Sequence, residues 1–352
     1  MTSANSKYSH KIKSILNFTI SLILAVVFLY VAFYDVNFSE VLELSSKASL
    51  GWGLLFVLLN FLGHIVRTYR WKLILSSVKE EIKFKNLFNS LMISYGVNCV
   101  TPKLGEVARA VLIARWENLS RSSMFGTVIL ERLIDVFFLI ISILIGIYFS
   151  SENIQLEFPW LMNAVYILTI FLIGLFVFIS LIFYKKEKFS LVIKKIFGSI
   201  SKTFADKIDY IIRMLIEGLS SLKGYKNLFL TMILSFIIII IYATTSYVGM
   251  LMLGMNELRP INILMGWVVM SISAIGVIVP TPGSTGSYHT LAKSSLVFIY
   301  NFDETISASY AFLTHLISYS LMIITAFIIY IFSIKNNLKI NELTKNQIEN
   351  LK

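Results

Sequence analysis

Residues 86–116 have the sequence NLFNSLMISYGVNCVTPKLGEVARAVLIARW, in which an apolar run ends abruptly at a Thr-Pro pair. The apolar part, 86–100, is clearly shorter than the roughly 20 residues that a membrane-spanning helix needs. Threonine commonly caps a helix N-terminus and proline suits the first helical position, so Thr101 and Pro102 predict the start of a second helix. We therefore expect 86–116 to form a helical hairpin rather than a span.

A second proline-rich break, residues 280–286 (PTPGSTG), interrupts the apolar stretch 261–300. The chain has five prolines, and the two outside these breaks, Pro159 and Pro260, fall in predicted loops. Irregular backbone at membrane depth is tolerated only where protein or water satisfies its polar groups. Broken segments in both halves of a chain favour an inverted-repeat transporter with a site near the midplane, whereas two proline-kinked helices in a bundle are the alternative.

The composition places most of the chain in lipid. Of 352 residues, 57% are hydrophobic and only 14% are charged, and the mean hydropathy is +0.77. We predict an all-α polytopic helical bundle, a single domain over 1–352, with about seven long spans and the two broken hairpins. The long apolar runs are Ile15–Tyr34, Leu50–Val66, Met124–Phe149, Leu161–Tyr184, Leu228–Leu253, Ile261–Val279 and Ile306–Ile334.

The distribution of basic residues predicts the orientation. Lysine and arginine concentrate on the cytoplasmic side of membrane proteins, and 23 of the 31 here lie in four segments. These segments are 1–14, 67–85, 185–226 and 335–352. Both termini are therefore predicted to be cytoplasmic, in an inner or cytoplasmic membrane, and 185–226 to form an amphipathic helix at the headgroup layer. With both ends cytoplasmic, 86–116 would be re-entrant; 261–300 would re-enter from outside or, alternatively, cross fully.

Several functional classes are disfavoured by the sequence. The net charge of +11 comes from short basic stretches between apolar runs, which favours anionic lipid headgroups over nucleic acid as partners. The single cysteine, Cys99, gives no disulfide framework, and the histidines lack metal-ligand spacing. No phosphate-binding loop and no nucleophile-base pair is recognisable, so neither a cofactor nor an enzymatic activity is expected.

Charged residues at membrane depth carry the functional hypothesis. Lys103 and Arg109, with free amides near Pro102, are predicted to hold a phosphate, while nearby carboxylates position these cations or carry protons. The headgroup path predicted in this way consists of Asn98, Thr101, Pro102, Lys103, Gly105, Glu106, Arg109, Glu131, Arg132, Asp135, Pro280, Pro282, Gly283, Gly286 and His289.

Two groups of these charges have alternative interpretations. Glu131, Arg132 and Asp135 could instead form structural ion pairs between helices, and the sequence does not separate the two roles. Arg67, Arg70 and Trp71 end an apolar run, where anchoring at the membrane interface is the favoured role and headgroup capture is the alternative.

Four motifs together resemble one family. They are residues 98–109 (NCVTPKLGEVAR), 67–71 (RTYRW), 131–135 (ERLID) and 280–283 (PTPG). In order and spacing they are similar to the lysylphosphatidylglycerol synthase transmembrane region family, also called the flippase-like or UPF0104 family. The resemblance implies a membrane domain that moves a charged or glycosylated lipid between leaflets, without implying synthesis.

The resemblance has one departure and leaves two alternatives. Family members often carry an acidic residue soon after the late glycine motif, whereas Tyr288 and His289 follow Gly286 here. No role for that acid can be transferred to this chain. The first alternative is a membrane component of a lipid-linked glycosyl or aminoacyl transferase, which would have a lipid-modifying transferase as its partner. A structural membrane partner protein is the second.

Overall fold

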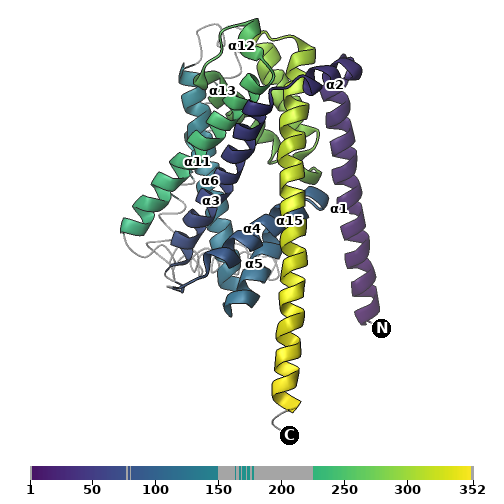
Figure 1. The fold of residues 1–352 in the computed structure, drawn as a ribbon, viewed down its shortest axis with the longest axis vertical. Helices are drawn as coiled ribbons and strands as arrows, with labels where there is room; N and C mark the ends of the chain where they lie inside the picture. The colour runs from purple at the N-terminus through teal and green to yellow at the C-terminus, as the bar shows by residue number, and fades with distance from the viewer. Residues whose placement is uncertain are drawn as a thin grey trace, which may run out of the picture.

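The computed structural model describes residues 2–76, 78–79, 81–149 and 225–349, with scattered positions between 163 and 177. Side chains are described over 16–76, 78–79, 81–149 and 226–332, again with scattered positions between 163 and 177. The predicted span Leu161–Tyr184, apart from those positions, and nearly all of the basic segment 185–226 lie outside the described residues. Regular structure in the described part is helical throughout, as Figure 1 shows, which agrees with the all-α membrane fold expected from the sequence.

Four described helices are long and apolar enough to cross a membrane. They are α1 (Thr2–Phe33), α3 (Leu50–Leu75), α11 (Tyr225–Met252) and α15 (Glu304–Glu349). The predicted run Ile261–Val279 instead yields α13 (Ile263–Gly276), whose 14 residues extend only about 21 Å. This length is short of the ~30 Å hydrocarbon core, so α13 is not a complete span by itself.

Residues 86–116 fold as two helices, α4 (Phe84–Val100) and α5 (Leu104–Glu117), joined by a short turn. The predicted start of the second helix is wrong by about two residues. Thr101 ends α4 in an extended conformation, and Lys103, with φ of 65°, makes the left-handed turn that precedes α5. Pro102 therefore lies in the turn. The side chain of Asn98 satisfies the start of α5, because its Oδ1 accepts a hydrogen bond from the Gly105 amide at 2.8 Å.

The second break separates α13 from α14 (Ser287–Ser294) and contains a 3-10 turn, η1 (Pro282–Ser284). A π-helical turn, η2 (Ser295–Ile299), continues α14. Gly286 has φ of 86°, and a Cβ there would lie 2.6 Å from the carbonyl oxygen of Ala25 in α1. Glycine is thus required where this break packs against the first helix.

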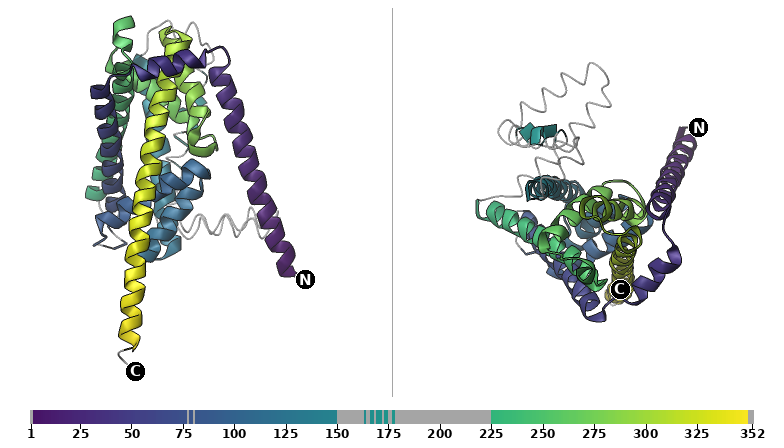
Figure 2. Two further views of the ribbon diagram at one scale, coloured as in Figure 1. Left: turned by 45° about the vertical axis from the view of Figure 1, so that its right-hand side comes forward. Right: turned by 90° about the horizontal axis from the view of Figure 1, so that it is seen from above.

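Helix α15 contacts the tips of both broken segments. The hydroxyl of Tyr319 donates to the carbonyl oxygen of Cys99, at the end of α4, at 2.9 Å. One turn earlier, His315 Nε2 lies 2.9 Å from the carbonyl oxygen of Gly283 in η1. The two breaks, far apart in sequence, therefore meet beside one long helix, visible in yellow in Figures 1 and 2.

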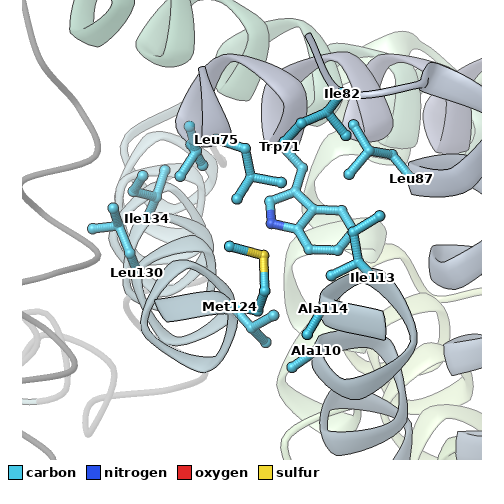
Figure 3. Packing of buried hydrophobic residues seen from close by; sticks show 12 residues of the cluster. Trp71, Leu75, Ile82, Leu87, Ala110, Ile113, Ala114, Met124, Leu130 and Ile134 are labelled. Atoms are coloured by element: carbon cyan, nitrogen blue, oxygen red, sulfur yellow. The ribbon is translucent and has the colours of Figure 1, made fainter. Parts of the chain in front are cut away.

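The two ends of the molecule have separate apolar clusters. One joins α3, α4, α5 and α6 (Arg121–Phe149) around the buried ring of Trp71, as Figure 3 shows. The other lies among α13, α14 and the start of α15, near the short helices α2 (Phe38–Ser46) and α12 (Met255–Leu258). The start of α1 and the end of α15 lie at the end opposite α2 and α12 (Figure 1).

Candidate functional site

Helices α3 and α6 bring two arginines and two carboxylates together. Arg67 and Arg70, three residues apart, share one face of α3, and Glu131 and Asp135, four apart, share one face of α6. Glu131 Oε1 lies 3.0 Å from Arg67 Nε and 3.1 Å from Arg70 Nη2. Asp135 Oδ1 lies 2.6 Å from Arg70 Nη2, and its other oxygen contacts Arg67. Each carboxylate therefore bridges both guanidiniums.

Two further arginines complete this basic cluster, which we define as Arg67, Arg70, Arg109, Glu131, Arg132 and Asp135. Arg109 Nη2 reaches Glu131 Oε2 at 2.7 Å, and its guanidinium stacks over the Trp71 ring with 4.4 Å to the centroid. Arg132 Nη2 lies 3.3 Å from Glu131 and 3.4 Å from Asp135 at the more exposed edge. Four guanidiniums and two carboxylates leave a net charge of +2.

The basic cluster is buried to an extent that makes its excess charge costly. Glu131 is 0% exposed, and Arg70 and Arg109 are each 1% exposed. Ser235 and Tyr242 of α11 accept hydrogen bonds from Arg70 and Arg67 at 3.1 and 3.4 Å. Within the described residues, Arg109 Nε and Nη1 have no hydrogen-bond partner. Buried cations that outnumber their carboxylates are stabilised by an additional anion, so the cluster is suited to bind one.

A cavity of about 680 Å³ adjoins the basic cluster. Arg67, Arg70, Arg132 and Asp135 line it, together with Lys103 from the α4–α5 turn and Glu106 from the first turn of α5. The remaining walls are mostly apolar side chains of α3, α6, α11 and α13, with a few hydroxyl groups. A volume of this size, largely apolar with a few charged groups at one place, is typical of a site for an amphiphilic ligand.

Residues of the predicted phosphate site are arranged differently from the expectation. Arg109 and Glu106, three apart on α5, do not pair with each other: Arg109 binds Glu131, and Glu106 Oε2 accepts from Asn98 Nδ2 at 3.2 Å. Lys103 lines the cavity, but the cations that line it as well are Arg67, Arg70 and Arg132, whereas Arg109 does not. Arg109 therefore positions Glu131 and does not itself line the cavity.

Interface anchoring does not describe Arg67, Arg70 and Trp71. Arg67 is 8% exposed, and Arg70 and Trp71 are 1% and 0% exposed. The Trp71 Nε1 donates to Thr127 Oγ1 on α6 at 3.3 Å. A polar end to an apolar run looks the same in the sequence whether it faces headgroups or packs against partners some 60 residues away. The ion pairs between helices proposed as an alternative do form for Glu131 and Asp135, which pair with Arg67 and Arg70 of α3. In the described part of the chain, Arg132 instead pairs within α6, with Glu131 and Asp135.

The sequence profile of the lysylphosphatidylglycerol synthase TM region matches residues 18–326. The chain belongs to this family. A UPF0104 membrane protein of Methanocaldococcus jannaschii is 24% identical over 220 residues, which are 59% of this chain and 62% of the relative. One of Pyrococcus horikoshii is 23% identical over 322 residues, 85% of this chain and 92% of the relative.

A third UPF0104 membrane protein, of Methanothermobacter thermautotrophicus, is 28% identical over 166 residues, 45% of this chain and 49% of the relative. The chain thus spans about half the length of the Methanothermobacter relative and about three fifths of the length of the Methanocaldococcus relative. The family match includes the basic cluster and both broken segments. The family's name connects these membrane domains with lipid, and its members named here are membrane proteins without a stated activity.

In this family member, the second break contributes to the cavity through a residue that the sequence did not single out. Pro280, Pro282, Gly283 and Gly286 shape the backbone, and His289 is buried, its Nδ1 accepting from the Gly286 amide at 3.2 Å. None of these lines the cavity, whereas Tyr288 does, together with Tyr242 and Tyr310 on neighbouring helices. Uncharged hydroxyls within apolar runs give no distinctive sequence signal, so these tyrosines were missed.

The described residues contain no group of three histidine, cysteine, aspartate or glutamate side chains placed to hold a metal ion. The polar groups that line the cavity include cations, carboxylates and hydroxyls. Such groups can bind and orient an anion and exclude competing cations. This arrangement supports recognition of a charged ligand.

Proposed function

We propose that this protein binds an anionic or aminoacylated lipid by its phosphate in the cavity beside the basic cluster, and moves it between membrane leaflets. The observation that carries this proposal is the basic cluster, which has a net charge of +2, is buried except at its Arg132 edge, and borders a cavity of about 680 Å³ with mostly apolar walls. Guanidinium groups match phosphate oxygens in pairs and are less strongly hydrated than ammonium groups. The cavity thus offers charge to the headgroup and apolar surface to the chains.

Each part of the site has a separate role in the proposal. Arg67, Arg70, Arg132 and Lys103 face the cavity and would contact the phosphate. Glu131 pairs with the guanidiniums of Arg67, Arg70 and Arg132. Arg109 in turn holds Glu131 by an ion pair, and its own guanidinium is held by stacking on Trp71. This division predicts that cavity-facing cations affect lipid binding, whereas Arg109 affects the shape of the cluster.

The meeting of the two broken segments supports a polar route through the membrane. Their tips lie side by side at α15, with Tyr319 bound to the end of α4 and His315 next to Gly283. Irregular backbone at membrane depth is tolerated where protein satisfies it or where it lines a water-filled cavity, as transporters require around a central path. A headgroup moving past these tips would meet backbone carbonyls and hydroxyls rather than hydrocarbon.

The proposal can be tested by lipid exchange in reconstituted vesicles. Arg132 suits the test because it lines the cavity with a 40% exposed side chain, and its loss leaves the ion pairs of Arg67, Arg70 and Arg109 in place. We expect Arg132→Gln to slow leaflet exchange of fluorescent phosphatidylglycerol at least tenfold. Arg121→Gln is the matched control, because it removes one positive charge from an exposed position on the same helix, outside the cavity.

Two outcomes would contradict the proposal. Exchange in vesicles with the wild-type protein at the rate of protein-free vesicles would exclude translocation under these conditions. Equal rates for Arg132→Gln and Arg121→Gln would exclude the cavity as the route. A Lys103→Gln variant provides an independent check, since Lys103 comes from a different element and faces the same cavity.

A further inference from the structure

A second cavity, of about 470 Å³, lies at the end of the molecule that carries α2, between the C-terminal part of α1, α14 and the start of α15. Its charged side chains are Asp35, Lys293 and Glu304. Among the described residues, the two cavities have no lining residue in common. The second cavity is therefore a separate feature. The α2 end of the molecule, where its lining residues lie, is opposite the N and C labels in Figure 1.

The charges of the second cavity complement a zwitterion. Lys293 Nζ lies 2.7 Å from Glu304 Oε2, and the Lys293 side chain is only 12% exposed, whereas that of Glu304 is 47% exposed. Asp35 at the end of α1 adds a second, exposed carboxylate. One ammonium and two carboxylates leave a net charge of −1, the opposite sign to the basic cluster. This set can hold a phosphate at Lys293 and an ammonium group at the carboxylates.

The rim of the second cavity is apolar and aromatic. Tyr30 and Tyr34 are 63% and 64% exposed, and Val31 and Phe298 are 51% and 58% exposed. Exposed tyrosines beside apolar side chains are typical of the interface between headgroups and hydrocarbon. A soluble zwitterion would make no use of this rim, whereas the glycerol backbone and acyl chains of a lipid would cover it.

The backbone around this cavity is also specialised. The hydroxyl of Thr290 donates to the Phe28 carbonyl oxygen at 2.9 Å, which fixes α14 to α1 at the wall of the cavity. The π-helical turn η2 follows α14 and supplies Val297 and Phe298 to the lining. Such turns cost helix stability and occur frequently at functional sites, so their presence beside a charged cavity points to a ligand.

We propose that the second cavity binds the headgroup of a lipid that carries both a phosphodiester and a primary ammonium group, with the phosphate at Lys293 and the ammonium at Asp35 and Glu304. This site goes beyond the proposed translocation and does not require it. A lipid can occupy the second cavity whether or not the basic cavity moves lipid, so the two proposals can fail separately.

The test is lipid retention by the purified full-length protein in native mass spectrometry, with phosphatidylethanolamine and phosphatidylglycerol as probes. We expect Asp35→Asn combined with Glu304→Gln to lower retention of phosphatidylethanolamine at least fivefold and to leave that of phosphatidylglycerol unchanged. Arg132→Gln, in the other cavity, is expected to show the reverse pattern. Thermal unfolding of each variant checks that the fold is kept, and Asp35→Asn alone, at an exposed position, serves if the double variant does not fold.

Three results would overturn the second site. Phosphatidylethanolamine could be retained equally by the wild type and by Asp35→Asn with Glu304→Gln. Both lipids could instead be lost in parallel, which would show a general defect. Finally, soluble glycerophosphoethanolamine could displace the lipid at equal concentration, which would assign the site to a water-soluble zwitterion. Loss of lipid exchange in vesicles, by contrast, would leave this site intact and contradict only the proposed translocation.

Discussion

The two broken segments differ in the charge of the side chains around them, although uncharged side chains bond the broken backbone in both. Beside α4 and α5, the neighbouring helices carry guanidiniums and carboxylates, with Glu131 at the centre of four ion pairs. Beside α13 and α14, neutral groups predominate. Ser287 Oγ donates to the Gly276 carbonyl oxygen at 2.7 Å and lies 3.1 Å from Thr281 Oγ1.

The difference separates two requirements that a membrane protein must meet. Neutral hydrogen bonds suffice to satisfy a broken helix, as the second segment shows. The buried charges beside the first segment exceed this requirement and carry a net charge, which structure alone does not need. The difference therefore favours ligand binding as the role of the charges beside the first segment. For the second segment it favours a role in shaping the proposed headgroup path. The inverted repeat remains a prediction, and any such repeat would relate segments of unlike chemistry.

The largest expected effect comes from removing the central carboxylate. Glu131→Gln would leave Arg67, Arg70, Arg109 and Arg132 with only Asp135, and we expect a loss of stability of about 3–5 kcal/mol. Unfolding by SDS titration in mixed micelles measures this change. Glu106→Gln is the matched control, because Glu106 is half-buried and its one described partner is Asn98. Similar stabilities for the two variants would show that the cluster is not a charge-dependent unit.

In both broken segments the two helices that flank the break, α4 with α5 and α13 with α14, pack closely together. In this respect the two segments are alike. A Cβ on Gly105 would lie 2.1 Å from the Ser94 carbonyl oxygen, and one on Gly276 would lie 2.7 Å from the Ser287 carbonyl oxygen. Backbone must move in both cases, so we expect Gly105→Ala to lower the free energy of unfolding by about 1–3 kcal/mol. The loss for Gly276→Ala should be smaller, because its added Cβ would overlap less with the facing carbonyl oxygen. SDS titration again provides the measurement. Gly51→Ala, with no atom within 4 Å, should be neutral or stabilising, and an equal loss there would contradict packing as the cause.

The existence of both breaks was predictable, but their detailed geometry was not. Proline and glycine positions predicted where the helices end, since these residues restrict or release the backbone locally. The predicted start of α5 is misplaced because Pro102 suits a first helical position. The turn instead requires one residue with a left-handed backbone conformation, and Lys103 adopts it. That requirement arises from how α4 and α5 pack, through Gly105 against Ser94, and such packing is not encoded in local preferences.

The candidate site was predictable in its charges and not in its contacts. Charged residues at membrane depth are expensive, so Glu131, Asp135 and Arg109 stood out in the sequence. Arg67 and Arg70 were assigned to anchoring because their partners lie 61 to 68 residues away along the chain. Spacing on a single helix identifies shared faces but not which helix the face meets. The tertiary pairing of α3 with α6 supplied that information.

A smaller effect is expected at the neutral break. Ser287→Ala would remove the hydrogen bond to the Gly276 carbonyl oxygen and the contact with Thr281, and we expect a loss of about 1 kcal/mol. Ser46→Ala on the exposed helix α2 is the control, since its hydroxyl bonds only to Glu43 within its own helix. SDS titration of both variants makes the comparison. A loss at Ser287 as large as that at Glu131 would erase the energetic difference between the two segments.

The smallest expected effect concerns pH at Glu117, the last residue of α5. Its side chain accepts hydrogen bonds from Lys79 and Asn86, each at 2.7 Å, and so ties the loop before α4 and the first turn of α4 to the end of α5. Burial raises the pKa of this carboxyl, but the hydrogen bond and charge of Lys79 and the hydrogen bond of Asn86 outweigh it, and the pKa falls below its ordinary 4.5. The ionised form therefore stabilises the fold above about pH 4.5, and this contribution is lost as the pH falls through the lowered pKa.

Glu117→Gln should consequently be less stable than the wild type near pH 7 by no more than about 1 kcal/mol, because the Lys79 side chain is 38% exposed and partly screened by solvent. The difference should shrink as SDS titrations are repeated from pH 6 towards pH 3. High salt at pH 7 should narrow it as well, since screening weakens the Lys79 pair. A difference that stayed constant across this pH range would mean that Glu117 acts through shape and its neutral hydrogen bonds alone. The charge dependence of the first segment would then be confined to the buried cluster around Glu131.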